Sequence, residues 1–287
     1  MSDEGGESAC FLDLVDDDGR IVTEADSRNV STMRWLYVSF DVPESVADAE
    51  QAFWPAVLGW QLGEPWQGHE EFRSLVPTSG DMYAHMQRVD GPLAIHFDLG
   101  VDDVAATAAR LVALGATQVA DFDIWRVLMS PGGVPFCLVP GGGEHVPGPA
   151  VWPDGHRSRL VQLCLDSPDE LHEGEIAFWR AATAWRYEPH SMSEFGGKLF
   201  PPAPAPVQLL FQRLGDDYGA TSTRVHIDLG TDDIPADVAR IEQLGATRSA
   251  YEGDGWVQLA DPGGMPFCVT HNSPDGWGQA PSVPTHD

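Results

Sequence analysis

The sequence predicts an α+β protein in which one β-α-β-β-β unit is used four times. A nine-residue stretch occurs twice, as Ile-His-Phe-Asp-Leu-Gly-Val-Asp-Asp at 95–103 and Val-His-Ile-Asp-Leu-Gly-Thr-Asp-Asp at 225–233. Apolar and polar residues alternate in both copies, which is the pattern of a strand with His and Asp on one face. Residues 35–41 resemble 160–166, and 130–137 resemble 261–268. Similar segments at a nearly constant spacing indicate a duplicated domain.

Each copy is expected to contain the unit twice. In the first copy a strand at 35–41 precedes a helix at about 44–58, which Pro55 should shorten or kink. Shorter strands follow as far as Arg88. The second unit begins with a strand at 94–101 and continues with a helix at about 103–114. Strands are then expected near Thr117, at 124–129 and at 134–139.

The second helix of each copy has clear end signals. Asp102 and Asp232 are placed to cap the N-termini, and Gly115 and Gly245 follow the last apolar-periodic residues. The predicted organisation of the chain is an acidic N-terminal extension at 1–31, domain 1 at 32–145, a linker at 146–157, domain 2 at 158–271 and a tail at 272–287. Within the extension, residues 11–23 can form a hairpin on an Asp-Gly turn.

The composition restricts the class of partner. A formal net charge of -28 disfavours nucleic acid, whose phosphates would be repelled. The start of the chain lacks a signal-peptide pattern and no apolar run is long enough to span a bilayer, so we expect a cytoplasmic protein without a membrane partner. The four cysteines are expected to be reduced thiols.

The repeated motifs resemble the vicinal oxygen chelate superfamily, which contains glyoxalase I, bleomycin-resistance proteins and extradiol dioxygenases. The second copy contains nearly every motif of the glyoxalase-like subgroup: Asp166-Ser167-Pro168, Ala177-Phe178-Trp179, Arg224-Val225-His226, Leu-Gly-Ala-Thr at 244–247 and Asp-Pro-Gly-Gly-Met-Pro-Phe-Cys at 261–268. The resemblance spans residues 33–140 and 158–270. It implies that βαβββ modules pair so that a mixed sheet curls into a cup, with four modules in two tandem domains.

The resemblance also implies where a site would lie. Metal-binding members have ligands on the first, fourth, fifth and eighth strands. The fifth-strand His matches His96 and His226, and alternation places Asp98 and Asp228 on the same face, where they are candidate catalytic partners. The remaining candidate ligand-binding residues are Tyr37 and Gln162 on the first strand, Gln87 and Gln212 on the fourth, Cys137 and Cys268 on the eighth, and Trp35, Trp125 and Trp256 near the rim of the cup.

The matched positions lack the family's carboxylate ligand, so no metal cofactor is favoured. If the first domain holds a metal, we expect His85, His96 and Cys137 to bind it. Otherwise both histidines are hydrogen-bonding residues that line the cup.

Two classes of function therefore follow from the sequence. The first is a metal-independent protein of the resistance or sequestration type that binds a small aromatic or cationic molecule in the cup. The alternative is an enzyme of the superfamily, a lyase, isomerase or dioxygenase, that uses a metal or a His/Asp acid-base pair. The chain is expected to be a monomer with internal domain pairing or a homodimer.

Overall fold

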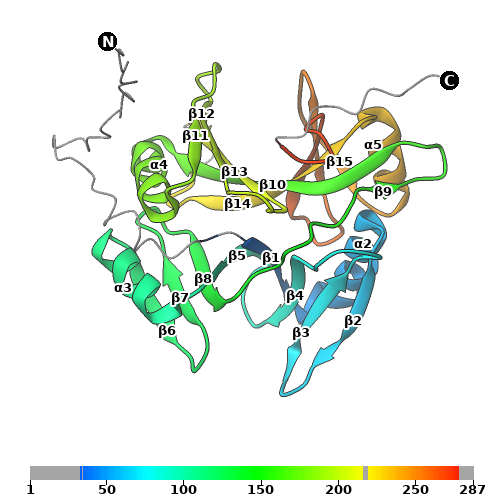
Figure 1. Cartoon of the computed structure of the whole chain (residues 1–287). Coiled ribbons are helices and arrows are strands. Elements are labelled where there is room, and N and C mark those ends of the chain that lie inside the picture. The colour runs from blue at the N-terminus through cyan, green and yellow to red at the C-terminus, as the bar shows by residue number, and fades with distance from the viewer. Residues whose placement is uncertain (1–32, 34, 216–218, 278–287) are drawn as a thin grey trace, which may run out of the picture. The chain divides into compact units, whose positions relative to one another are not determined.

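The computed structural model describes residues 33, 35–215 and 219–277, which form two mixed β-sheets with four α-helices (Figure 1). The predicted hairpin at 11–23 lies outside the described residues. The α+β class, the curled sheets and the two tandem domains are confirmed. The first sheet has eight strands and the second has nine, counting a short edge strand.

The first sheet contains two βαβββ modules that meet at their first strands. Its strand order is β2-β3-β4-β1-β5-β8-β7-β6, so β1 and β5 are the central antiparallel pair. The elements are β1 (Trp35–Pro43), α2 (Ala47–Leu58), β2 (Gln61–Trp66), β3 (His69–Val76), β4 (Ala84–Val89), β5 (Ala94–Val101), α3 (Val104–Ala113), β6 (Thr117–Asp121), β7 (Arg126–Met129) and β8 (Pro135–Pro140).

The second sheet repeats this order as β11-β12-β13-β10-β14-β17-β16-β15, with the short strand β9 paired to β10. The elements are β9 (Ala150–Val151), β10 (Arg157–Pro168), α4 (Asp169–Thr183), β11 (Arg186–Glu188), β12 (Phe195–Phe200), β13 (Gln208–Leu214), β14 (Arg224–Thr231), α5 (Ile234–Gln243), β15 (Thr247–Gly253), β16 (Trp256–Ala260) and β17 (Pro266–Thr270).

Two local expectations are corrected. The N-caps of α3 and α5 are Asp103 and Asp233, whose side chains accept from Ala106 N and Ala236 N, and not Asp102 and Asp232. The second residue of each Asp pair has the extended backbone that a cap needs. In addition, α2 continues through Pro55 and ends at Gly59, whose φ of 70° stops the helix.

The first helix of each domain packs on its own sheet and also contacts the sheet of the other domain. Trp179 of α4 lies 5.2 Å from Phe97 and 5.0 Å from Phe136, ring centroid to centroid, and both phenylalanines belong to the first sheet. Reciprocally, Trp54 of α2 lies 5.1 Å from Phe267 of the second sheet. All of these rings are fully buried. Large aromatic surfaces are therefore removed from water only when both domains are present.

Two arginines bind the C-terminal ends of α2 and α4. Arg110 of α3 donates through Nη2 to Ala182 O, at the end of α4, over 2.8 Å. Arg240 of α5 donates in the same way to Val57 O of α2 over 3.1 Å. These bonds satisfy carbonyls that a helix end leaves open. Figure 1 shows the resulting pairs, α3 beside α4 and α2 beside α5.

A buried glutamate of each of these two helices, Glu50 in α2 and Glu175 in α4, binds a Pro-Gly-Gly turn of the opposite sheet. Glu175 Oε1 accepts from the Ser130 hydroxyl over 2.7 Å and from Gly132 N. Glu50 Oε1 accepts from Gly263 N over 2.7 Å. A Cβ on either glycine would collide with the glutamate, so the approach of helix to turn depends on both glycines.

The two turns differ at one position. Ser130 in the first sheet corresponds to Asp261 in the second, and each side chain accepts a backbone N–H of its own turn. Glu50 therefore faces a carboxyl group where Glu175 faces a hydroxyl. Burial, together with the adjacent Asp261, raises the pKa of Glu50 to about 8. The pair Glu50–Asp261 is accordingly held by a shared proton.

The raised pKa of Glu50 predicts an alkaline loss of stability. A folded-state pKa above the unfolded value of 4.5 gives stability that is fully present below that value and is lost as the pH rises through about 8. Asp261→Ser, which copies the other turn, should reduce this loss by about 1–3 kcal/mol when urea unfolding at about pH 6 is compared with that at about pH 9.

Ser130→Asp is the matched reverse variant, because it builds the same carboxyl pair against Glu175. It should increase the alkaline loss of stability. Equal pH dependence in the wild type and in Asp261→Ser would contradict the shared-proton interpretation.

Candidate functional site

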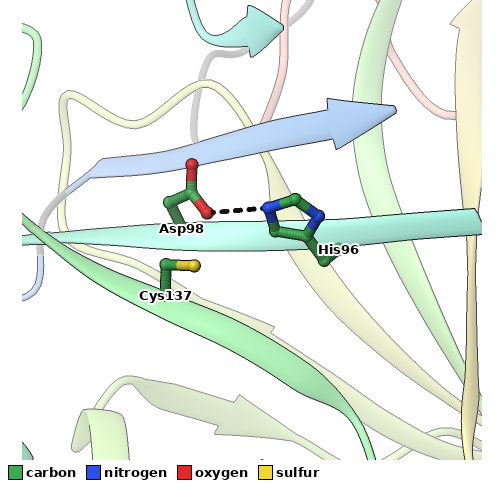
Figure 2. A group of neighbouring side chains, drawn as sticks. All are labelled: His96, Asp98 and Cys137. Atoms are coloured by element: carbon green, nitrogen blue, oxygen red, sulfur yellow. Dashed lines mark ion pairs between the residues drawn. The ribbon is translucent and has the colours of Figure 1, made fainter. Parts of the chain in front are cut away.

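Each cup contains a histidine held between two carboxylates. In the first domain, His96 Nδ1 lies 2.8 Å from Asp41 Oδ2. His96 Nε2 lies 3.3 Å from Asp98 Oδ1, the ion pair that Figure 2 shows. In the second, His226 Nδ1 lies 2.7 Å from Asp166 Oδ2, and His226 Nε2 lies 3.2 Å from Asp228 Oδ1.

Strand register explains both arrangements. In the antiparallel pair of β1 and β5, Ser39 is opposite His96. Alternate residues of a strand share one face, so Asp41 on β1 and Asp98 on β5 reach the imidazole from its two sides. The opposite face of β5, with Phe97 and Leu99, is buried in the core, as the alternation predicts.

The two carboxylates decide the charge of each imidazole. Burial of the His226 ring favours its neutral form, but Asp166 and Asp228 outweigh burial and hold its pKa well above the usual range. The pKa of His96 is likewise raised well above its usual value against the effect of burial, by Asp41 and Asp98. The carboxylates therefore favour the imidazolium form of both rings, with Nδ1 hydrogen-bonded to one aspartate and Nε2 within ion-pair distance of the other.

A cysteine completes each group. Cys137 is in register with Asp98, and Cys268 with Asp228. Burial raises the pKa of both thiols, so they are protonated. Cys268 Sγ lies 3.7 Å from His226 Nε2.

These residues include groups able to hold a divalent metal ion. One potential ligand atom from each of His96, Asp98 and Cys137 lies within 4.8 Å of the others, and the same is true of His226, Asp228 and Cys268. Imidazole, carboxylate and thiolate are ligands of zinc, and a carboxylate on Nδ1 is the usual support of a metal-binding histidine. Metal binding would require the imidazolium and the thiol to lose their protons.

The first cup differs in detail from the predicted donor set. Asp98, not His85, joins His96 and Cys137. His85 instead packs among aromatic rings, with its ring centroid 5.5 Å from that of Tyr37 and 5.2 Å from that of Trp66. Burial lowers the pKa of His85 to about 4. Gln87 follows His85 on the cup face of β4, as its register with Asp41 requires.

The two tryptophans named in the first domain lie away from this group. Trp35 is fully buried, with its ring beneath Gly143, and leaves no surface for a ligand. Trp125 lies in the turn before β7, stacked on Phe122 and edge-on to His69.

The second cup opens into a large cavity. Its volume is about 1240 Å³, and its walls include residues of both sheets. Of the residues named from the sequence, those in the walls are Gln162, Gln212, His226, Asp228, Trp256 and Cys268. Gln162 Nε2 donates to Asp228 Oδ2, and Gln208 Nε2 donates to Gln162 Oε1 over 2.6 Å. A chain of amides thus fixes the carboxylate that faces His226.

Sequence reasoning missed three kinds of residue. Asp41 and Asp166 were visible as repeated residues before a proline at a strand end, on the same face as Tyr37 and Gln162. Gln208 is the register partner of Gln162, which only the sheet reveals. Lys198 of β12 lines the cavity, and its signal was compositional, because it is the sole lysine of the chain.

Comparison with known proteins identifies the family. The family profile described as Glyoxalase-like domain matches residues 37–139 and 162–270. The chain belongs to this family. Both matched segments coincide with the two sheets, so each domain is one glyoxalase-like unit. Among curated protein sequences none matches the chain.

Solved structures share the fold of this glyoxalase-like protein. The Mn(II)-bound glyoxalase from Novosphingobium aromaticivorans matches with a TM-score of 0.59 at 16% identity, over 85% of this chain and 83% of that one. The 2,2',3-trihydroxybiphenyl 1,2-dioxygenase from Sphingomonas wittichii strain RW1 matches with a TM-score of 0.55 at 14% identity, over 84% of this chain and 90% of that one.

A longer protein also matches. It is a xylose isomerase-like TIM barrel/4-hydroxyphenylpyruvate dioxygenase fusion protein, with a TM-score of 0.56 at 14% identity. The match covers 84% of this chain and only 49% of the fusion protein. Identities this low establish the shared fold and leave the chemistry to the site. Among the described helices, none has the length and apolarity needed to cross a membrane.

The double ion pair predicts a specific titration. Asp166→Asn removes one of the two charges that stabilise the His226 imidazolium, so its pKa should fall. Histidine NMR across a pH series measures this shift. Asp41→Asn should lower the pKa of His96 and leave His226 unchanged, which makes each variant the control for the other. An unaltered His226 titration in Asp166→Asn would contradict the assignment.

Proposed function

We propose that the second domain binds a small aromatic molecule in its cup, without a metal, as a sequestering protein. The observation that supports this proposal is the cavity of about 1240 Å³ above His226. Ligand sites are typically concave and mostly apolar, with a few placed polar groups. Here Phe195, Leu210, Trp256 and Met265 supply apolar walls.

The hydrogen bond and ion pair of His226 support a role in ligand binding and not in catalysis. Its Nδ1 is hydrogen-bonded to Asp166, its Nε2 lies 3.2 Å from Asp228 Oδ1 as an ion pair, and Asp228 Oδ2 accepts from Gln162. An acid-base pair needs a group free to take a proton from the ligand. The ion pair and these hydrogen bonds hold the two residues in place, so we assign them the role of a fixed polar floor.

The imidazolium form of His226 also supports a metal-free cup. An imidazolium nitrogen has no lone pair for a metal, and the Cys268 thiol is protonated because burial raises its pKa. A metal would have to displace both protons and break the ion pair of His226 with Asp228. In contrast, an organic ligand can occupy the cavity without disturbing these interactions.

The proposal predicts that ligand binding does not depend on metal. Protein purified without chelator should contain less than stoichiometric iron, manganese, nickel or zinc by elemental analysis. An aromatic probe such as naphthylacetamide should bind equally well with and without EDTA in calorimetry. Loss of binding on EDTA treatment, restored by one metal, would contradict it.

Trp256→Ala tests the location of binding. Loss of an aromatic wall should weaken probe affinity by about tenfold, equivalent to about 1.4 kcal/mol. Trp125→Ala is the matched control, because Trp125 occupies the equivalent position of the first domain and lies outside the cavity walls. Equal effects of the two substitutions would contradict a site in the second cup.

A second candidate function is a metal-dependent enzyme that uses the first cup. It is favoured by the set His96, Asp98 and Cys137, with His96 Nδ1 oriented by Asp41. A divalent ion there would act as a Lewis acid on a substrate oxygen. Asp41 would orient the imidazole, and Asp98 and Cys137 would complete the donor set. Stoichiometric metal that is lost in His96→Ala and retained in His226→Ala would establish this alternative.

A further inference from the structure

The chain contains one lysine, and that lysine lines the cavity of the second cup. All other cationic side chains of the Lys/Arg class are arginines, 15 of the 16. Lys198 lies on β12 opposite Leu210 of β13, and both side chains face the cavity. The equivalent residue of the first domain is Ser74, which is opposite His85 on β4. The ammonium group therefore belongs to the second cup, and the first domain has a serine at the matching position.

The ammonium of Lys198 makes no ion pair within 4.0 Å in the described part of the chain, although the charge of Asp228 favours its protonated form. Its one hydrogen bond goes from Nζ to Asn272 Oδ1 over 3.2 Å, which leaves two of its three N–H donors unused. The side chain is half-buried, and burial lowers its pKa. Half-buried charges are normally paired with an opposite charge. This cation lacks such a partner although the chain has 44 acidic residues.

Neighbouring groups hold the amine at the cavity wall. Lys198 and Asn272 also line a side pocket of about 180 Å³, together with Phe200 and Trp277. Asn272 lies two residues after the end of β17, and Arg159 anchors the next turn through a 2.7 Å bond from Nε to Pro274 O. The amine thus lies on the border between the side pocket and the main cavity.

We propose that Lys198 is the anchor for an anionic group, so that the ligand of the second cup is an aromatic carboxylate. This inference rests on the proposed binding function and specifies its ligand class. The carboxylate would accept the free N–H donors of Lys198, while the ring lies against the apolar walls. An ammonium suits this role because it is a compact point charge with rotatable donors.

The charge of the whole protein does not oppose this assignment. A net charge of -28 repels anions at long range, but salt screens such interactions beyond about 8 Å at physiological ionic strength. The cavity walls also contain carboxylates, such as Asp228, but Lys198 is the group with free N–H donors that an anionic ligand would contact. The negative surface should instead slow the association of an anionic ligand at low salt.

The test is a matched series of probes that differ only in charge: naphthylacetate, naphthylacetamide and naphthylethylamine, measured by equilibrium dialysis on the full chain. The acetate should bind about tenfold more tightly than the amide, as one charge-assisted hydrogen bond provides. Lys198→Met should abolish this preference and leave the affinity for the amide within about twofold. Lys198→Arg should retain part of it.

A direct readout follows from the single lysine. Reductive methylation with labelled formaldehyde introduces NMR signals only at Lys198 and the N-terminal amine. Naphthylacetate should raise the pKa of the Lys198 signal, because a bound carboxylate favours the charged amine. Naphthylacetamide should leave that pKa unchanged.

The outcomes separate the two proposals. Tighter binding of the amine than of the acetate, or an acetate preference that survives in Lys198→Met, would overturn the role of Lys198 and leave a binding cup. Absence of binding by all three probes would overturn the binding function itself, and with it the ligand class.

Discussion

The reciprocal contact of α2 and α4 with the opposite sheet is the constraint on which this structure depends. Trp179 packs on Phe97 and Phe136 of the first sheet, Trp54 packs on Phe267 of the second, and each helix places a buried glutamate on the opposite sheet's Pro-Gly-Gly turn. Neither sheet is covered by its own helices alone. Folding of one domain is therefore coupled to docking of the other, and the walls of the second cavity, which come from both sheets, exist only in the docked state.

Duplication has preserved this framework and allowed the two cups to diverge. The histidine between two carboxylates is present in both, because it depends only on the register of the central strands. The residues around it differ. Aromatic rings of Tyr37, Trp66 and His85 pack together in the first cup. Amides and Lys198 occupy the corresponding side of the second, beside an open cavity. The two cups thus keep the same His/Asp/Cys group and differ in the side chains around it.

Several site residues were predictable from the sequence for a physical reason. The alternation of apolar and polar residues along 95–103 and 225–233 places His and Asp on the same face of each strand, independently of the rest of the chain. The partners of the histidines were not predictable with the same certainty. Asp41 meets His96 because two strands pair in one register, and a shift of one residue would place Asp41 on the opposite face. Likewise, the unpaired state of Lys198 depends on the side chains that surround it in space.

The sequence by itself determined the fold class, the duplication and the strands that hold the histidines, because these depend on local periodicity and on motifs repeated within the chain. Only the tertiary structure decided that α2 and α4 also contact the opposite sheet, that Glu50 meets a carboxyl group, and that the second cup opens into a large cavity. These features result from contacts between residues far apart in the chain, such as Glu50 with Gly263. Local patterns specify which face a residue occupies, and packing alone specifies which residue it meets.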